Sequence, residues 1–409
     1  MTSPESVGMG TDRLARINPV MQSFVDSGEF AGLSVLIARR GETVFAGQYG
    51  HRDREAGRPM TADTIFRIYS MTKPIVSSAL MILFEEGRFR LIDPVAKYLP
   101  AFATVKVQTA DGDLVDPVRP MQIRDLLSHT SGLTYDFLQD FAVANRYRDA
   151  RLMNDPTRSL EAVIDELATM PLAFHPGTRW HYSLGIDVVA RLIEVIAGQP
   201  LGEFLQQRMF EPLGMTDTAF GVSGDKLHRL SAMYGHPDLF AAGQTFGAIF
   251  QAWMNGYNKR ADVSDTYPTD APDVFVRGGI GLYSTIGDYA RFAQMLLNDG
   301  QLDGHRILSR PTLNLMHSNH LPAALLPYEL GGAANPGFGF GLGSRVVTNV
   351  AETAGVGSVG EYGWAGAAKT YYWIDPAEEL IGLFMSQYMV CFNQPEQDLR
   401  ALTYQAIID

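Results

Sequence analysis

The pattern of apolar and polar positions predicts a helix and a hairpin at the start of the chain. In residues 12–28 apolar side chains recur at helical spacing, and Gly28 follows the last of them as a stop signal. The apolar face of this helix consists of Leu14, Ile17, Met21, Phe24 and Val25. Residues 32–50 contain two β-rich runs separated by an Arg-Gly pair, which is typical of a β-hairpin.

The pattern then becomes helical in the middle of the chain and strand-like towards its end. A long apolar helix is expected to begin at "YSMTKP", residues 69–74. Further helices are predicted at 122–128, 159–169, 186–197 and 202–209, and within 275–300 after a glycine-rich turn and strand. Strands of one antiparallel sheet are predicted within 338–347, 362–375 and 380–387, followed by a final helix at 396–408. The segment pattern predicts an α+β fold with a helical insertion.

Composition narrows the possible functions. The chain has 409 residues, 46% of them hydrophobic, and a formal net charge of -12, which argues against nucleic acid as a partner. The first residues lack the basic-then-apolar pattern of a signal peptide, and no apolar run approaches the roughly 18 residues of a membrane span. We therefore expect a cytoplasmic protein that does not act on membranes. Cys391 is the single cysteine, which excludes an internal disulfide and a cysteine zinc site.

Candidate chemistry first appears in the Ser-Met-Thr-Lys segment at 70–73. Residues three apart share a helix face, so the Lys73 amine can reach the Ser70 hydroxyl. A serine becomes a nucleophile when a neighbouring base takes its proton. A lysine can be that base only if burial or nearby positive charge lowers its pKa. The apolar residues that follow predict such burial, whereas the alternative is that Ser70 merely caps the helix.

Three other segments are weak signals when taken alone. Ser223 and Lys226 repeat the S-x-x-K spacing, but in a polar stretch that predicts a solvated turn. Tyr182 precedes a predicted helix and is either a base beside a lysine or an ordinary core tyrosine. Trp364 and Gly366 lie in a strand-like run, where a glycine often marks a close backbone approach.

Taken in order, these segments resemble the motifs of the serine β-lactamase and penicillin-binding-protein superfamily. Its pattern is S-x-x-K, then Y-x-N or S-x-N, then K-T-G. Longer runs are also similar: "LIDPVAKYLPAF", "IRDLLSHTSGL", "PGTRWHYS", "EPLGMTDTAF" and "GGIGLYSTIGDYARFAQMLLNDG". The resemblance covers roughly residues 60 to 390, and is greatest to the class C β-lactamase-like branch and, within it, to the family VIII carboxylesterases.

The resemblance implies a β-lactamase/DD-peptidase-like fold, in which helices flank a central antiparallel sheet. Residues 1–69 and 274–409 would form the α+β domain, and residues 70–273 a mostly helical inserted domain. The active site would lie in the cleft between the two.

The same resemblance implies roles for individual residues. Ser70 would be the acylated nucleophile, Lys73 its proton partner and Tyr182 a second base. The backbone N–H groups of Ser70 and Ala367 would hold the oxyanion. Which of Lys73 and Tyr182 is the general base remains open at this point. No metal or organic cofactor is required.

Departures from the superfamily pattern point to the substrate. Leu184 stands where penicillin-recognising relatives have asparagine, and Trp364 begins a Trp-Ala-Gly in place of Lys-Thr-Gly. These replacements remove the groups that pair with an amide and a carboxylate, and an unpaired buried polar group costs about 1–3 kcal/mol. A neutral ester is therefore favoured over a β-lactam. Lys369 follows nearby and is expected to be a solvated strand lysine.

The aromatic stretch 238–258 is a candidate wall of the substrate pocket. Phe250 and Trp253 belong to it, with Tyr135 and Phe137 expected on the opposite side. The alternative is that these side chains only pack the helical part of the molecule.

The resulting prediction is a serine carboxylesterase that cleaves short-to-medium acyl esters of small molecules through a Ser70 acyl-enzyme. Alternatives are a β-lactamase or D-alanyl peptidase, an acyltransferase of the same fold, and a non-catalytic homologue used for binding. The natural ester, the stereochemical preference and the oligomeric state, monomer or homodimer, do not follow from the sequence.

Overall fold

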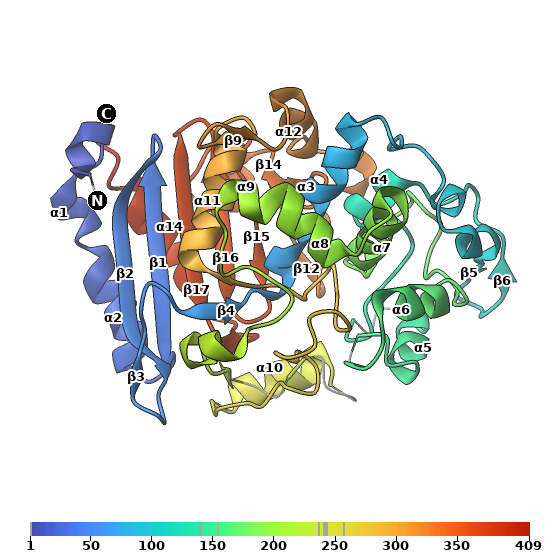
Figure 1. Ribbon diagram of the computed structural model, residues 1–409, viewed down its shortest axis with the longest axis horizontal. Coiled ribbons are helices and arrows are strands. Elements are labelled where there is room, and N and C mark those ends of the chain that lie inside the picture. The colour runs from blue at the N-terminus through green and yellow to red at the C-terminus, as the bar shows by residue number, and fades with distance from the viewer. Residues whose placement is uncertain (1, 139–140, 154, 236–237, 240–243, 257) are drawn as a thin grey trace.

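An eight-stranded antiparallel sheet forms the centre of the molecule in the computed structural model (Figure 1). The structure describes residues 2–138, 141–153, 155–235, 238–239, 244–256 and 258–409. In spatial order the strands are β13 (Phe338–Phe340), β14 (Arg345–Val347), β15 (Tyr362–Gly366), β16 (Thr370–Asp375), β17 (Leu380–Ser386), β1 (Gly32–Arg39), β2 (Glu42–Asp53) and β3 (Arg58–Pro59). The predicted α+β fold is confirmed.

Helices lie on both faces of this sheet and form most of the middle of the chain. They are α1 (Thr11–Leu14), α2 (Ile17–Asp26), α3 (Thr72–Glu85), α4 (Ile123–Leu127), α5 (Val143–Asp149), α6 (Leu160–Leu167), α7 (Gly185–Ala197), α8 (Leu201–Leu205), α9 (Glu211–Leu213), α10 (Phe246–Met254), α11 (Ile286–Leu297), α12 (Arg310–Met316), α13 (Val350–Thr353) and α14 (Pro395–Tyr404). Helices α2 and α14 cover one face, and α11 packs on the other against β17 and β1.

The alternation of side chains along β1 explains why both faces of the sheet are covered. Leu33, Val35 and Ile37 lie in a core shared with α2 and α14. Leu36 and Ala38 point to the opposite face and belong to the main core. Because successive strand residues face opposite sides, an almost continuously apolar strand must be buried on both. Each fully buried Leu, Val or Ile contributes about 1.5–3 kcal/mol.

The predicted hairpin at 32–50 is confirmed, and two other predicted elements are divided. Arg40 and Gly41 form the turn between β1 and β2, both with positive φ (52° and 80°). The expected first helix is interrupted between α1 and α2. The expected strand region at 338–347 is a two-stranded hairpin, β13 with β14, and Gly343 in its connection has a φ of 99°.

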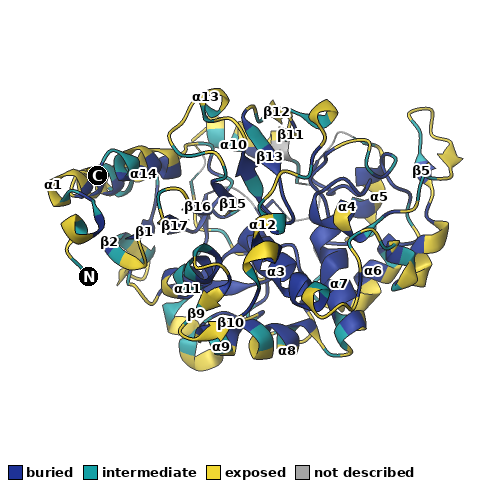
Figure 2. Cartoon of the chain, turned by 90° about the horizontal axis from the view of Figure 1, so that it is seen from above, coloured by how far each residue is buried: buried dark blue, intermediate teal, exposed yellow. Residues whose placement is uncertain are grey.

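Helix α3 is buried along almost its whole length. Every residue from Thr72 to Leu83 is buried, and α7 packs along it (Figure 2). A helix that is apolar on all sides has to lie inside the molecule, which is what its sequence predicts. One apolar core runs from α3 and α7 to the sheet, and the sheet takes its strands only from 32–59 and 338–386. The division into two domains stays a prediction.

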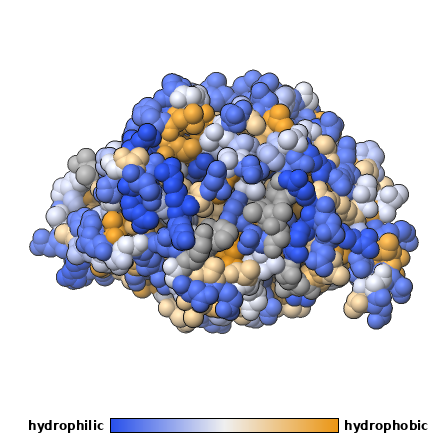
Figure 3. Space-filling view, turned by 90° about the horizontal axis from the view of Figure 1, so that it is seen from below, coloured by the Kyte–Doolittle hydropathy of each residue, from blue (hydrophilic) through white to orange (hydrophobic). Residues whose placement is uncertain are grey.

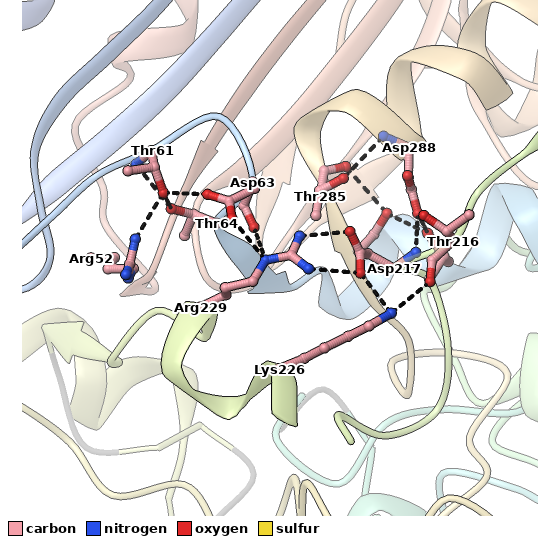
Figure 4. Close-up of polar contacts among 12 residues, drawn as sticks. Arg52, Thr61, Asp63, Thr64, Thr216, Asp217, Lys226, Arg229, Thr285 and Asp288 are labelled. Atoms are coloured by element: carbon pink, nitrogen blue, oxygen red, sulfur yellow. Dashed lines mark hydrogen bonds and ion pairs between the residues drawn. The ribbon is translucent and has the colours of Figure 1, made fainter. Parts of the chain in front are cut away.

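The second S-x-x-K segment has a structural role. Lys226 lies in a 3-10 turn, Gly224–Arg229, and its amine pairs with the Asp217 carboxylate at 2.8 Å and donates to the Thr216 carbonyl at 2.9 Å (Figure 4). Arg229 donates two hydrogen bonds of 3.0 and 2.6 Å to the same carboxylate. Ion pairs therefore hold this segment in place, and it is not a fully solvated turn. The Lys226 amine contacts Asp217 and Thr216 instead of Ser223.

Hydrophilic side chains cover most of the face seen from below, and hydrophobic ones form separate small groups (Figure 3). None of the helices in the described part of the chain combines the length and the apolar character that crossing a membrane requires.

Candidate active site

Ser70 lies at the junction between a strand and the buried helix. The chain leaves β4 (Ile65–Arg67), makes a 3-10 turn over Tyr69–Met71 and enters α3. Tyr69 has a φ of 43°, a left-handed conformation that is strained for an aromatic residue. Met71 occupies the cap position, and no side chain caps this helix. The Ser70 hydroxyl is therefore not used as a cap, and it sits where the helix dipole favours negative charge.

Lys73 points back towards Ser70 from the first turn of α3. Its Nζ donates to Ser70 Oγ at 3.1 Å and to the Gly279 carbonyl at 2.7 Å. The residue is 1% exposed. Burial lowers the pKa of the Lys73 amine to about 7, against the opposing pull of the Asp187 carboxylate. A substantial fraction of the amine is then neutral near pH 7 and can accept a proton.

Asp187 and Gly279 support Lys73, and sequence reasoning missed both. The Gly279 N–H donates to Asp187 Oδ1 at 3.1 Å, while the carbonyl of the same residue accepts from Lys73. A Cβ on Gly279 would lie 2.6 Å from Asp187 Oδ2 and 2.8 Å from the Tyr135 hydroxyl, so only glycine fits. The one available signal was an acidic residue inside the apolar run "GIDVVARLIEVIAG".

Tyr182 completes the group around the serine. The Lys73 Nζ lies 4.6 Å from the centre of the Tyr182 ring, and the Ser70 hydroxyl is near enough to the phenol to lower its pKa. The phenol oxygen also accepts from Trp364 Nε1 at 3.3 Å. Burial raises the pKa of Tyr182, and the hydrogen bonds from Ser70 and Trp364 only partly offset this. The phenol is therefore protonated at neutral pH.

A histidine that sequence reasoning did not single out packs against Tyr182. The His129 ring centre lies 4.8 Å from that of Tyr182, and Nδ1 is 3.2 Å from Ser183 Oγ. Burial, together with the Lys73 charge, lowers the pKa of His129 well below its usual value. His129 is thus a neutral packing residue. It lies within the run "IRDLLSHTSGL", which resembles the superfamily as a segment but gave no reason to choose any single residue in it.

A cavity of about 360 Å³ opens onto Ser70. Most of the side chains around it are apolar or aromatic, with a few charged groups. Its lining comprises Ser70, Phe137, Leu138, Tyr182, Leu239, Tyr328, Leu330, Gly331, Asn335, Arg345, Trp364, Ala365, Gly366, Ala367, Lys369, Thr370, Tyr371, Val390, Cys391 and Glu396. Of the predicted residues, Tyr135 lies just behind this lining, stacked on Phe137 with ring centres 4.8 Å apart.

The end of β15 approaches the serine through its glycine. A Cβ on Gly366 would lie 2.4 Å from the Ile68 carbonyl oxygen and 2.2 Å from Thr370 Oγ1. The predicted close backbone approach is therefore present, with the turn before α3 on the other side. Ala367 follows in the cavity lining, and its carbonyl accepts from the Val390 N–H at 2.7 Å.

The structure does not bring Phe250 and Trp253 into this cavity. Both lie on α10 and pack against Phe392, at ring-centre distances of 4.9 and 5.2 Å. Neither is part of the described cavity lining, and Phe250 is 38% exposed. The rest of the aromatic stretch falls partly outside the described residues, at 240–243 and 257.

The expectation for Lys369 was wrong. Residues 367–369 form the turn between β15 and β16, so Lys369 is not on a strand. Its side chain is 13% exposed and pairs with Glu396 at 2.9 Å. The alternation rule failed because it assumed an unbroken strand from Trp364 onwards.

Comparisons with known proteins identify the family of the chain. The model of the beta-lactamase family matches residues 17–405. Esterase EstB of Burkholderia gladioli is 31% identical over 379 residues, which are 91% of this chain and 90% of EstB. Lovastatin esterase of Penicillium rubens is 28% identical over 391 residues, 90% of this chain and 91% of that protein.

Among solved structures, EstCE1, a hydrolase with promiscuous acyltransferase activity, superposes with a TM-score of 0.79 at 28% identity. The match covers 96% of this chain and 99% of EstCE1. The family match extends over nearly the whole chain, and the S-x-x-K lysine donates to a serine that lines a cavity. The chain therefore belongs to the beta-lactamase family, as a hydrolase of the serine beta-lactamase fold.

Proposed function

We propose that this protein is a serine carboxylesterase that cleaves short-to-medium acyl esters through an acyl-enzyme on Ser70. The observation that carries the proposal is the hydrogen bond of 3.1 Å between Ser70 Oγ and the amine of Lys73, whose pKa burial lowers to about 7. A neutral amine at this distance can take the hydroxyl proton as Oγ attacks the ester carbonyl.

The positions of Ser70, Lys73 and Tyr182 support the following steps. The new Oγ–C bond pushes negative charge onto the carbonyl oxygen, which the N–H groups of Ser70 and Ala367 stabilise. Losing one such donor typically costs about 10²–10³-fold in rate. The proton taken by Lys73 passes to the leaving alcohol, and Tyr182 lies beside both Ser70 and Lys73 to carry it. Water then attacks the acyl carbonyl and gives a proton to Lys73; the bond between the carbonyl carbon and Ser70 Oγ breaks, the proton returns to Oγ, and the acid leaves.

The choice between the two bases follows from their burial. Burial lowers the pKa of the Lys73 amine into the neutral range but raises that of the Tyr182 phenol. Lys73 is therefore assigned as the general base, and Tyr182 as a proton carrier and hydrogen-bond partner of the serine.

The cavity supports an ester as the substrate. Its volume of about 360 Å³ is at the small end of ligand pockets, which span roughly 300–1,000 Å³. Trp364 occupies the position where the superfamily pattern has a lysine, and it uses its indole N–H on Tyr182. Leu184 is fully buried. Hydrolysis of nitrocefin should therefore be far slower than that of p-nitrophenyl butyrate.

The decisive test replaces the serine. Ser70→Ala should abolish hydrolysis of p-nitrophenyl butyrate and leave the melting temperature unchanged. Ser223→Ala is the matched control, since Ser223 has the same S-x-x-K spacing but is exposed. Labelling with a serine-reactive phosphonate and mass spectrometry should locate the adduct on Ser70. Activity in Ser70→Ala, or an adduct elsewhere, would refute the proposal.

Acyl transfer is the second candidate function. EstCE1, at 28% identity, is described as a hydrolase with promiscuous acyltransferase activity. Adding an alcohol to the p-nitrophenyl butyrate assay separates the two reactions, because a transferase would form the new butyrate ester in preference to free butyrate.

A further inference from the structure

Lys369 occupies an unfavourable backbone conformation at the edge of the catalytic cavity. Its φ is 59°, in the left-handed region that glycine tolerates and side chains disfavour. Residues kept in such conformations concentrate at ligand sites, where the surrounding structure holds them in place. Lys369 also lies in the lining of the cavity that contains Ser70. Arg40 and Glu379 have the same backbone conformation in ordinary turns, so it is the place of Lys369 in the cavity lining that bears on a ligand.

The Lys369 ammonium is only partly satisfied by its neighbours. It donates to Glu396 Oε1 at 2.9 Å and to the Cys391 carbonyl at 3.3 Å. An ammonium carries three N–H groups, and these contacts use two of them within the described part of the chain. One donor remains for a group in the cavity.

Glu396 contributes an unused acceptor beside this donor. The residue is 7% exposed, and its Oε2 is buried without a hydrogen-bond partner among the described residues. A buried carboxylate oxygen left unpaired is unfavourable. Glu396 lines the same cavity, and a ligand that displaces the packing over Oε2, which has almost no accessible surface, can supply the missing donor.

The charge around this pair restricts the chemistry of that ligand. Lys369 and Glu396 neutralise each other. The other charged residue in the cavity lining is Arg345, which donates to the Tyr371 hydroxyl and lies 3.9 Å from the Glu361 carboxylate. Because the pair carries no net charge, neither a carboxylate nor an ammonium in the ligand gains a net attraction from it. A hydroxyl both donates and accepts, and so satisfies both residues.

We propose that Lys369 and Glu396 form a polar subsite that binds a hydroxyl group of the ester substrate, away from the bond that is cleaved. The inference rests on the proposed esterase function and names its substrate class as hydroxylated esters. Both residues determine specificity in this proposal and take no part in the acyl transfer at Ser70.

Two series of matched esters test the subsite. In one, p-nitrophenyl butyrate, hexanoate and octanoate are compared with their ω-hydroxy analogues. In the other, butyl, hexyl and octyl butyrate are compared with esters of the corresponding diols, with acid release followed by titration. Wild type should prefer the hydroxylated member at one chain length at least. In the double variant Lys369→Gly, Glu396→Gln this preference in kcat/KM should fall about tenfold, the value of one hydrogen bond to a charged group.

The double variant is chosen so that folding does not obscure the result. It removes both charges together and leaves no isolated buried ion, and glycine accepts the left-handed backbone. If it nevertheless fails to fold, Glu396→Gln alone replaces the unpaired acceptor oxygen by an amide donor and should lower the preference in the same direction. Glu379→Gly is the control, because Glu379 is an exposed turn residue with a φ of 50° at the other end of β16.

The outcomes separate the two levels of the proposal. An equal preference in wild type and variants, no preference in wild type, or an equal loss on plain esters overturns the subsite. If wild type hydrolyses none of the esters, plain or hydroxylated, the esterase function itself fails.

Discussion

Lys73 is expected to lower the stability of the fold at neutral pH, so replacing it by methionine should stabilise the protein while removing its activity. Burial lowers the pKa of this amine from 10.5 to about 7. Between these values the unfolded chain binds the proton and the folded chain does not, so stability rises with pH across this window. Below about pH 7 both states are protonated, and the full penalty for burying the charge applies. At 1.36 kcal/mol per pKa unit this penalty is about 5 kcal/mol.

Methionine removes the charge and keeps an unbranched side chain of similar length. The Gly279 carbonyl then loses its donor, at a cost of about 1–3 kcal/mol. Lys73→Met should therefore be more stable than wild type by about 2–4 kcal/mol at pH 6, and less stable by about 1–3 kcal/mol above pH 10.5, where only the cost remains. Urea unfolding at pH 6, 8 and 10.5 measures the difference, with esterase activity followed in parallel.

The difference between the two proteins reports Lys73 together with the buried groups whose pKa its charge shifts, Asp187 and His129. Lys106→Met is the matched control: the Lys106 side chain is 45% exposed, and its replacement should change stability by no more than about 0.5 kcal/mol. A stability difference that is the same at all three pH values would show that Lys73 is not a destabilised buried amine. The reasoning about the general base would then fall with it.

Three further predictions concern the catalytic site and its support. The kcat/KM for p-nitrophenyl butyrate should rise with pH around pH 7, as the Lys73 ammonium loses its proton; a flat profile from pH 5.5 to 8.5 would argue against Lys73 as the base. Gly279→Ala should lower kcat by about tenfold or more, because its Cβ would lie 2.6 Å from Asp187 Oδ2 and displace the carbonyl that holds Lys73. A typical acid–base contribution to the rate is at least about 10²-fold. Steady-state kinetics equal to those of wild type would contradict this prediction. Glu361→Leu should destabilise the fold by about 3–5 kcal/mol in urea unfolding, because it leaves the buried Arg400 charge without its partner. The fully buried Glu361 carboxylate accepts hydrogen bonds of 2.6 and 3.0 Å from Arg400. Unchanged stability would mean that another group compensates the Arg400 guanidinium.

The nucleophile and its lysine could be predicted because their relation is local. Ser70 and Lys73 are three positions apart at a helix start, and the apolar residues after them predict the burial that changes the lysine pKa. Tyr182 and Trp364 are distant in sequence. Their place beside the serine was expected only from the resemblance to a superfamily with the same motif order.

The supporting residues could not be predicted, because they depend on how separate segments pack. In the sequence, Asp187 is an ordinary acidic residue in the first turn of a helix. Its partner Gly279 belongs to a distant part of the chain, so their contact could not be predicted. Aromatic content predicted burial for the stretch around Phe250 but not which surface it packs on. Lys369 was misplaced because a turn interrupts the strand, and the left-handed residue in that turn was not a glycine.

The pairing of β1 with β17 has a consequence for biosynthesis. These strands lie side by side in the sheet, one near each end of the chain (Figure 1). During translation β1 therefore presents an unpaired apolar edge until residues 380–386 have been made, and such edges recruit other chains. The termini themselves are close, since Met9 and Ile407 form a β-bridge. A circular permutant that joins them and opens the chain at an exposed loop would make this pairing local, and should fold faster and aggregate less than the natural order.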